Sequence, residues 1–230
     1  QASTRLVTAI DTYAGRWSEQ RIQVCGEQQQ GHTVTALRTA CLDNRRGALA
    51  ALVDALREAT PRELDRSGRA LATLPSLDDC GAIESLAGRQ PRPTDPLRLA
   101  ELRSVEQRFA AARTADLLGR RAAIHELSLV VTAAERLGYQ PLLADALGVI
   151  GRARAHDADP AAIAILRRAQ QAALAGADDH LLAGASIILY STATELGRPQ
   201  AECDELRATA RAAITRLQLR NHPASQRAEM

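Results

Sequence analysis

The fold of this chain is decided by residues 137–176, which read LGYQPLLADALGVIGRARAHDADPAAIAILRRAQQAALAG. Two Ala- and Leu-rich runs of helical length lie here between glycine and proline residues. Proline fits the first turn of a helix, where its missing N–H has no intrahelical partner, and glycine ends helices because it adopts the left-handed conformation without penalty. The stretch therefore predicts a helical hairpin, with helices at 141–156 and 160–175.

The same punctuation recurs through the second half of the chain. Proline stands at Pro96, Pro141, Pro160 and Pro199, and glycine at Gly119, Gly138, Gly176 and Gly197. These positions predict six helices, at 97–117, 120–137, 141–156, 160–175, 179–196 and 199–218. They form three hairpins with a repeat of roughly 40 residues, and stacked hairpins of this kind are scaffolds for binding.

The composition agrees with an all-α fold. Of the 230 residues 46% are hydrophobic but only 2% aromatic, so the apolar content is mostly alanine and leucine, which favour helices. The net charge is +2, with acidic residues interspersed among the arginines. A nucleic-acid partner is not expected, because its binding surface would need a basic stripe. No cofactor is expected either.

The first half predicts two long antiparallel helices. Residues 1–30 carry one apolar seam, interrupted at Gln20, and Gly31 breaks the helix. Thr33 is placed to cap the second helix. The two seams are Leu6, Ile10, Tyr13, Trp17 and Val24, then Val34, Leu37, Cys41, Ala48, Leu52 and Leu56. Narrow seams joined by a short connection predict a coiled-coil-like hairpin.

A third helix begins at Thr60. This residue is a good N-cap, Pro61 suits the first helical position, and Glu63 completes a capping box. The helix should end near Pro75, and a short helix should follow through Leu86.

Residues 88–96, GRQPRPTDP, hold four breakers and predict a linker. The expected organisation is therefore an N-terminal region at 1–87, the linker, hairpins at 97–219 and a polar tail at 220–230. The chain begins at Gln1, and we expect it to be a fragment. The longest uncharged stretch, 181–194, is too short to cross a bilayer, so this fragment should not insert into a membrane.

The middle hairpin is similar to a tetratricopeptide repeat (TPR). Leu147-Gly148 matches the large-then-small pair of the first helix in that family, and Ala162, Leu166 and Ala169 match the small, large, small spacing of the second. The resemblance implies a short right-handed superhelix of about three hairpins.

A second resemblance covers nearly the whole chain. The matching positions are Trp17, Val24-Cys25, Gly31, Arg38, Cys41-Leu42 and Arg45, then Leu49, Leu52 and Leu56, then Leu74-Pro75-Ser76-Leu77 and Cys80, then Leu137 to Leu142. Together they resemble the region downstream of the catalytic domain in tetratricopeptide-containing bacterial serine/threonine protein kinases of the myxobacterial type.

This resemblance implies a sensor or interaction region. It would lie on the extracytoplasmic side of the inner membrane if a transmembrane helix separates it from the kinase, and in the cytoplasm if that helix is absent. Trp17 lies on the helix seam and should be a core residue; the alternative is a place near the membrane interface. The chain has no glycine-rich loop, His-Arg-Asp or Asp-Phe-Gly motif, so no catalytic residue is assigned.

Cys25 and Cys41 are the candidate disulfide. They flank the turn between the first two helices, and an antiparallel hairpin can bring such positions face to face. The oxidising compartment implied by the kinase resemblance favours a bridge over two reduced thiols. Cys80 could compete for Cys41, and Cys203 should be a lone thiol.

No metal site is expected. The cysteine spacings do not fit zinc, and His125-Glu126 lacks the second histidine of the metalloprotease motif. The acidic clusters 156–159 and 178–180 lie at helix junctions, where aspartates are expected as N-caps.

The expected function is binding of a protein, peptide or small ligand on the concave face, with a second copy of the chain as another partner. Polar residues on the first helices of the hairpins are the candidates: Arg103, Gln107, Asp145, Arg152 and Tyr190. The rival interpretations are a cytoplasmic TPR adaptor, which free thiols would favour, and an enzyme with a closed pocket of titratable groups.

Overall fold

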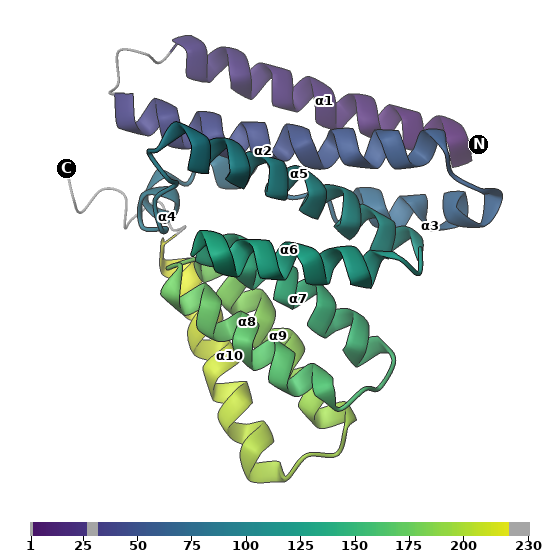
Figure 1. The fold of residues 1–230 in the computed structure, drawn as a ribbon, viewed down its shortest axis with the longest axis vertical. Helices are drawn as coiled ribbons and strands as arrows, with labels where there is room; N and C mark the ends of the chain where they lie inside the picture. Colours follow the sequence, from purple (N-terminus) through teal and green to yellow (C-terminus); the bar gives the residue numbers. More distant parts are fainter. Residues whose placement is uncertain (1, 27–31, 221–230) are drawn as a thin grey trace. The chain divides into compact units, whose positions relative to one another are not determined.

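The computed structural model describes residues 2–26 and 32–220, and every regular element in those ranges is helical (Figure 1). The chain is therefore an all-α protein. Its helices are α1 (Ala2–Gly26), α2 (His32–Arg57), α3 (Pro61–Ala72), α4 (Ile83–Ala87), α5 (Pro96–Leu118), α6 (Ala123–Leu137), α7 (Gln140–His156), α8 (Ala161–Ala175), α9 (Asp179–Glu195) and α10 (Gln200–Arg220). A short 3-10 turn, η2 (Asp78–Gly81), lies between α3 and α4.

The helices gather into two compact units. Unit 1 is Gln1–Ala87 with Glu106–Glu126, and unit 2 is Gly88–Val105 with Leu127–Met230. Helices α5 and α6 therefore contribute to both. This division differs from the expected one, because residues 88–96 belong to unit 2 rather than forming a linker, and residues 106–126 belong to unit 1 rather than to the hairpin array. The tail at 221–230 lies outside the described residues.

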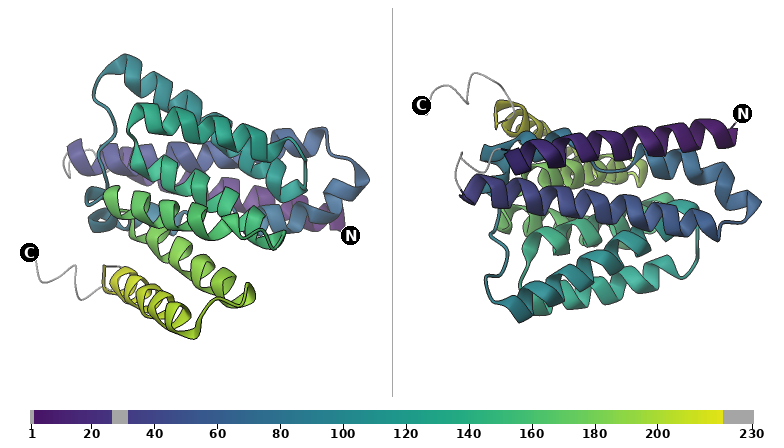
Figure 2. Two further views of the ribbon diagram at one scale, coloured as in Figure 1. Left: turned by 60° about the horizontal axis from the view of Figure 1, so that its bottom comes forward. Right: turned by 90° about the horizontal axis from the view of Figure 1, so that it is seen from above.

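In unit 1, α1 and α2 run side by side in opposite directions (Figure 2). Val24 and Leu42 are buried in a cluster that also holds Leu77 and Leu86. Trp17, predicted as a core residue, is half-buried and packs against this cluster. Helix α2 begins at His32, so Thr33 lies inside the helix and is not its cap. The predicted break at Gly31 falls outside the described residues.

The capping box at the start of α3 is confirmed. The Thr60 hydroxyl accepts from the Glu63 N–H, and the Glu63 carboxylate accepts from the Thr60 N–H at 2.8 Å. Arg120 then donates from Nε to the other Glu63 oxygen at 2.7 Å. These bonds favour the charged form, so the backbone bond from Thr60 and the Arg120 guanidinium lower the pKa of Glu63 to about 2.

The C-terminal half of α5 belongs to unit 1 because its last turn is buried there. Leu118 is fully buried in a cluster with Leu52 and Ala70. The Leu118 carbonyl, which the end of a helix leaves without an intrahelical partner, accepts from Arg66 Nη1 at 3.0 Å.

In unit 2, each helix from α7 to α10 packs on the next, as successive hairpins (Figures 1 and 2). The six predicted helices of the second half all form, with bounds within three residues of those expected. Ala162, Leu166 and Ala169 are fully buried on α8, as their small, large, small spacing predicts.

The small residue that lets α7 and α8 approach closely is Gly151. A Cβ added there would lie 2.6 Å from the Leu166 side chain, whereas a Cβ on Gly148 would meet nothing within 4 Å. The small residue at the contact between α7 and α8 therefore lies about one helical turn after the predicted Gly148. Gly151, and not Gly148, is on the side of α7 that faces α8.

Three of the four predicted helix-ending glycines adopt the left-handed conformation. The φ values are +81° at Gly119, +67° at Gly138 and +63° at Gly197. Gly176 differs, with φ of −83°, and Ala177 is left-handed in its place, with φ of +49°. A side chain at Gly176 would crowd Pro141, whose Cδ lies 3.0 Å from the added Cβ, so the neighbouring residues would have to shift by a few tenths of an ångström.

Candidate ligand-binding surface

The sequence-derived candidates fall in three places. Asp145 and Arg152 lie two turns apart on one side of α7 and are half-buried, and Tyr190 is half-buried on α9, which packs against α7. Arg103 is exposed on the part of α5 that belongs to unit 2. Gln107 is exposed one turn further along, in unit 1. Asp145, Arg152 and Tyr190 lie on the first helices of two successive hairpins of unit 2, and they are here called the α7/α9 face; Gln107 belongs to unit 1.

A shallow depression of about 250 Å³ lies between α7 and α8. Its lining is Gln140, Leu143, Leu147, Arg168, Gln171, Ala172 and Ala175. The volume is slightly below that of small-molecule pockets, which run from about 300 to 1,000 Å³. An apolar floor with two amide side chains and one guanidinium suits a short stretch of peptide better than a buried small ligand.

A carboxylate orients the one guanidinium of this depression. Arg168 donates from Nη2 to Glu135 of α6 at 2.6 Å. Both side chains are about half exposed, so the pair adds little stability but fixes the direction of the guanidinium. Sequence reasoning missed the depression, although Leu143 and Leu147 on α7 repeat at the spacing of one helix face.

The acidic clusters act as helix caps, as predicted. Asp178 accepts from the Leu181 N–H at 3.1 Å, and Asp159 accepts from the Ala161 N–H at 2.9 Å. Glu126, beside His125, lies 3.6 Å from Arg108. Within residues 2–26 and 32–220 no three His, Cys, Asp or Glu side chains gather as a metal site would require.

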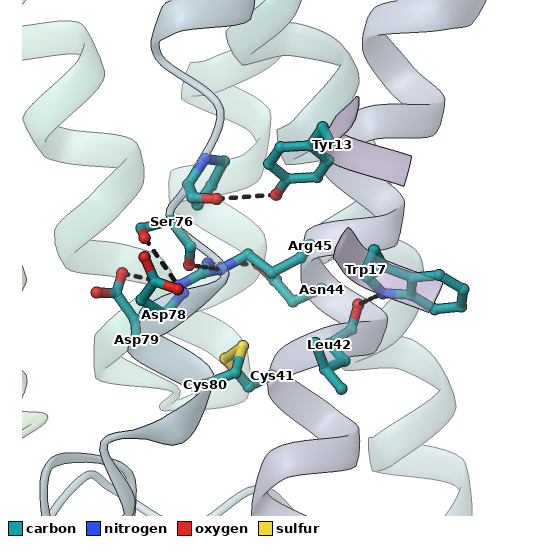
Figure 3. Close-up of a disulfide and its surroundings, with 11 residues drawn as sticks. Tyr13, Trp17, Cys41, Leu42, Asn44, Arg45, Ser76, Asp78, Asp79 and Cys80 are labelled. Atoms are coloured by element: carbon teal, nitrogen blue, oxygen red, sulfur yellow. Dashed lines mark hydrogen bonds and ion pairs between the residues drawn. A yellow bond between two sulfur atoms is a disulfide. The ribbon is translucent and has the colours of Figure 1, made fainter. Parts of the chain in front are cut away.

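The disulfide joins Cys41 to Cys80 (Figure 3), and their Cα atoms are 5.6 Å apart. Cys25 is an exposed thiol. The expected Cys25–Cys41 bridge is therefore wrong. The reason is the register of α1 on α2: Trp17 Nε1 donates to the Leu42 carbonyl at 2.8 Å. Cys25 lies about two turns, or about 11 Å, beyond the level of Cys41. Cys203 is a buried thiol, unbridged as expected.

Side chains from α1 and α2 hold the segment that carries Cys80 (Figure 3). Tyr13 donates its hydroxyl to the Pro75 carbonyl at 2.8 Å, and Arg45 donates from Nε to the Ser76 carbonyl at 3.0 Å. Arg45 also pairs with Asp79 at 3.4 Å. Burial raises the pKa of the Tyr13 phenol, outweighing the nearby Arg45 charge, so Tyr13 remains a donor at neutral pH.

No helix in the described ranges is long and apolar enough to span a bilayer. The chain matches no protein-family model, and comparison with curated proteins and with solved structures found no significant similarity.

Proposed function

We propose that this chain is a non-catalytic sensor or regulatory region that binds a protein, peptide or small ligand and belongs to a bacterial serine/threonine protein kinase. The observation that carries the binding role is the close packing of α7 on α8, at Gly151 and Leu166, with α9 following. Packing of this kind leaves the first helices of successive hairpins free to present side chains to a ligand.

The α7/α9 face is the proposed ligand surface. It offers a carboxylate, a guanidinium and a phenol from Asp145, Arg152 and Tyr190, all half-buried. Half-buried charged groups on packed helices keep little conformational freedom, so a ligand loses less entropy on contacting them than on contacting mobile surface chains. The kinase assignment rests on the sequence resemblance alone.

The Cys41–Cys80 disulfide supports an extracytoplasmic location over the cytoplasmic adaptor. Structural disulfides persist in the periplasm and are rare in the cytoplasm, where thiols are kept reduced. Under this proposal the gene should encode a kinase domain and an apolar segment of about 20 residues upstream of Gln1.

The test is the autophosphorylation of the kinase with this region attached. We expect Asp145→Ala with Arg152→Ala to abolish the response to the ligand while leaving the basal rate unchanged. The matched control is Asp204→Ala with Arg207→Ala, which removes the same two residue types from an exposed pair on α10. A parent gene without kinase motifs, or equal ligand responses in both double variants, would contradict the proposal.

A further inference from the structure

The segment Gly88–Pro91, here called the strap, lies across the helix ends of unit 2. Gln90 makes three hydrogen bonds there. Its N–H donates to the Gly176 carbonyl at 2.9 Å, its side-chain Nε2 donates to the Gly138 carbonyl at 2.9 Å, and its Oε1 accepts from the Gln140 N–H at 2.8 Å. A single residue thus forms hydrogen bonds with the backbone at both the α6–α7 and the α8–α9 junctions.

The groups that Gln90 contacts are ones that helices leave unsatisfied. The Gly138 carbonyl follows the end of α6, the Gln140 N–H is the first of α7, and the Gly176 carbonyl follows the end of α8. Such groups need a partner from outside the helix. A primary amide fits the first two together, because it carries a donor and an acceptor on the same side chain.

The neighbouring residue, Arg89, is recognised by a buried carboxylate. Its Nε lies 3.1 Å from Asp178 Oδ2, and the Asp178 side chain is only 5% exposed. Asp178 is held in place by its cap bond to the Leu181 N–H. A buried, oriented carboxylate beside two oriented backbone groups selects Arg followed by Gln in a segment that turns at Gly88 and bends at Arg89.

The depression between α7 and α8 adjoins this site. Gln140, whose N–H donates to the strap, also lines the depression, and so does Ala175, which precedes Gly176. A bound peptide longer than the strap would therefore find further contacts beside it.

We propose that these helix ends form a peptide-recognition site that the chain fills in cis with its own strap. The partner that displaces the strap is a protein presenting an Arg-Gln segment that bends at the arginine, as the strap does at Arg89. The proposal goes beyond the proposed function, because it concerns another surface than the α7/α9 face and holds with or without an attached kinase.

The cis arrangement predicts that the wild-type chain excludes a competing peptide. A tethered segment acts at an effective concentration in the millimolar range, far above that of a micromolar competitor. Removing the strap side chains should open the site to a peptide in trans.

The experiment measures fluorescence anisotropy of a labelled peptide LAGRQPRP, which copies residues 86–93, with the full chain. We expect Arg89→Ala with Gln90→Ala to bind it at least tenfold more tightly than the wild type does. A peptide with alanine in place of both Arg and Gln should not bind. Asp178→Asn added to the double variant should weaken binding about tenfold, because the amide keeps an acceptor for the cap but loses the charge.

The matched control is Gln200→Ala with Arg207→Ala, which removes the same residue types from exposed positions on α10. It should exclude the peptide as the wild type does. If circular dichroism shows that the double strap variant is unfolded, Gln90→Ala alone keeps the Arg89–Asp178 pair and serves in its place. A folded strap variant that does not bind at millimolar peptide, or that binds the alanine peptide equally, would overturn the proposal.

Discussion

Two glycines on α7 have different physical roles. Gly151 faces Leu166, where a Cβ would lie 2.6 Å from the leucine side chain, and Gly148 faces open space. Glycine in a helix interior costs about 1 kcal/mol relative to alanine, so it persists only where the space is needed or selection is weak. Gly151 is therefore the residue that sets the distance between α7 and α8.

This contrast predicts opposite effects of the same substitution. Gly151→Ala should lower the free energy of unfolding by about 1–3 kcal/mol, because the methyl group forces Leu166 out of its place. Gly148→Ala, the matched control, should raise it by about 0.5–1 kcal/mol. Urea denaturation followed by circular dichroism measures both. Equal changes in the two variants would contradict the proposed packing of α7 on α8.

At the scale of elements, the disulfide supports a segment with little regular structure of its own. Between α3 and α4 the chain has only the short turn η2, and it is held by Tyr13, Arg45 and the Cys41–Cys80 bridge. The buried cluster of Val24, Leu42, Leu77 and Leu86 packs around this bridge. Covalent and side-chain contacts here replace the backbone bonds that a helix would supply.

The bridge should contribute substantially to stability. It joins residues separated by 39 positions, and closing a loop of that length is expected to stabilise the fold by about 4 kcal/mol. Cys41→Ala with Cys80→Ala should lower the free energy of unfolding by about this amount, measured in urea. Cys25→Ala, which removes an exposed thiol, should change it by less than about 0.5 kcal/mol. A large loss in Cys25→Ala and none in the double variant would mean that the pairing is different.

Helix ends could be predicted from the sequence because their signals are local. Pro61 and Glu63 mark the start of α3, and Asp178 the start of α9, through contacts with residues only a few positions away. The partner of Cys41 could not be predicted in this way. It depends on the register of α1 on α2 and on where the segment after α3 returns, and neither is encoded within one turn of the cysteine.

At the scale of the whole molecule, the division into units could not be predicted from breakers in the sequence. Residues 88–96 carry the glycine and prolines of a typical linker, and nothing local indicates that Arg89 and Gln90 bond to helix junctions about 50 to 90 residues further along. Contacts between distant residues also decide which parts of the candidate site could be predicted. Asp145 and Arg152 were found from helix periodicity, whereas the depression and the strap depend on packing between elements.

Unit 2 should behave as one body of stacked hairpins that includes the strap. Amide hydrogen exchange, followed by NMR on the full chain, tests this directly at Gln90, which lies outside any helix. We predict that the Gln90 N–H exchanges at least roughly 100-fold more slowly than in an unstructured peptide, and that it opens together with the Gln140 N–H as urea is added. Exchange of Gln90 at the unstructured rate, while the amides of α7 remain protected, would contradict the account.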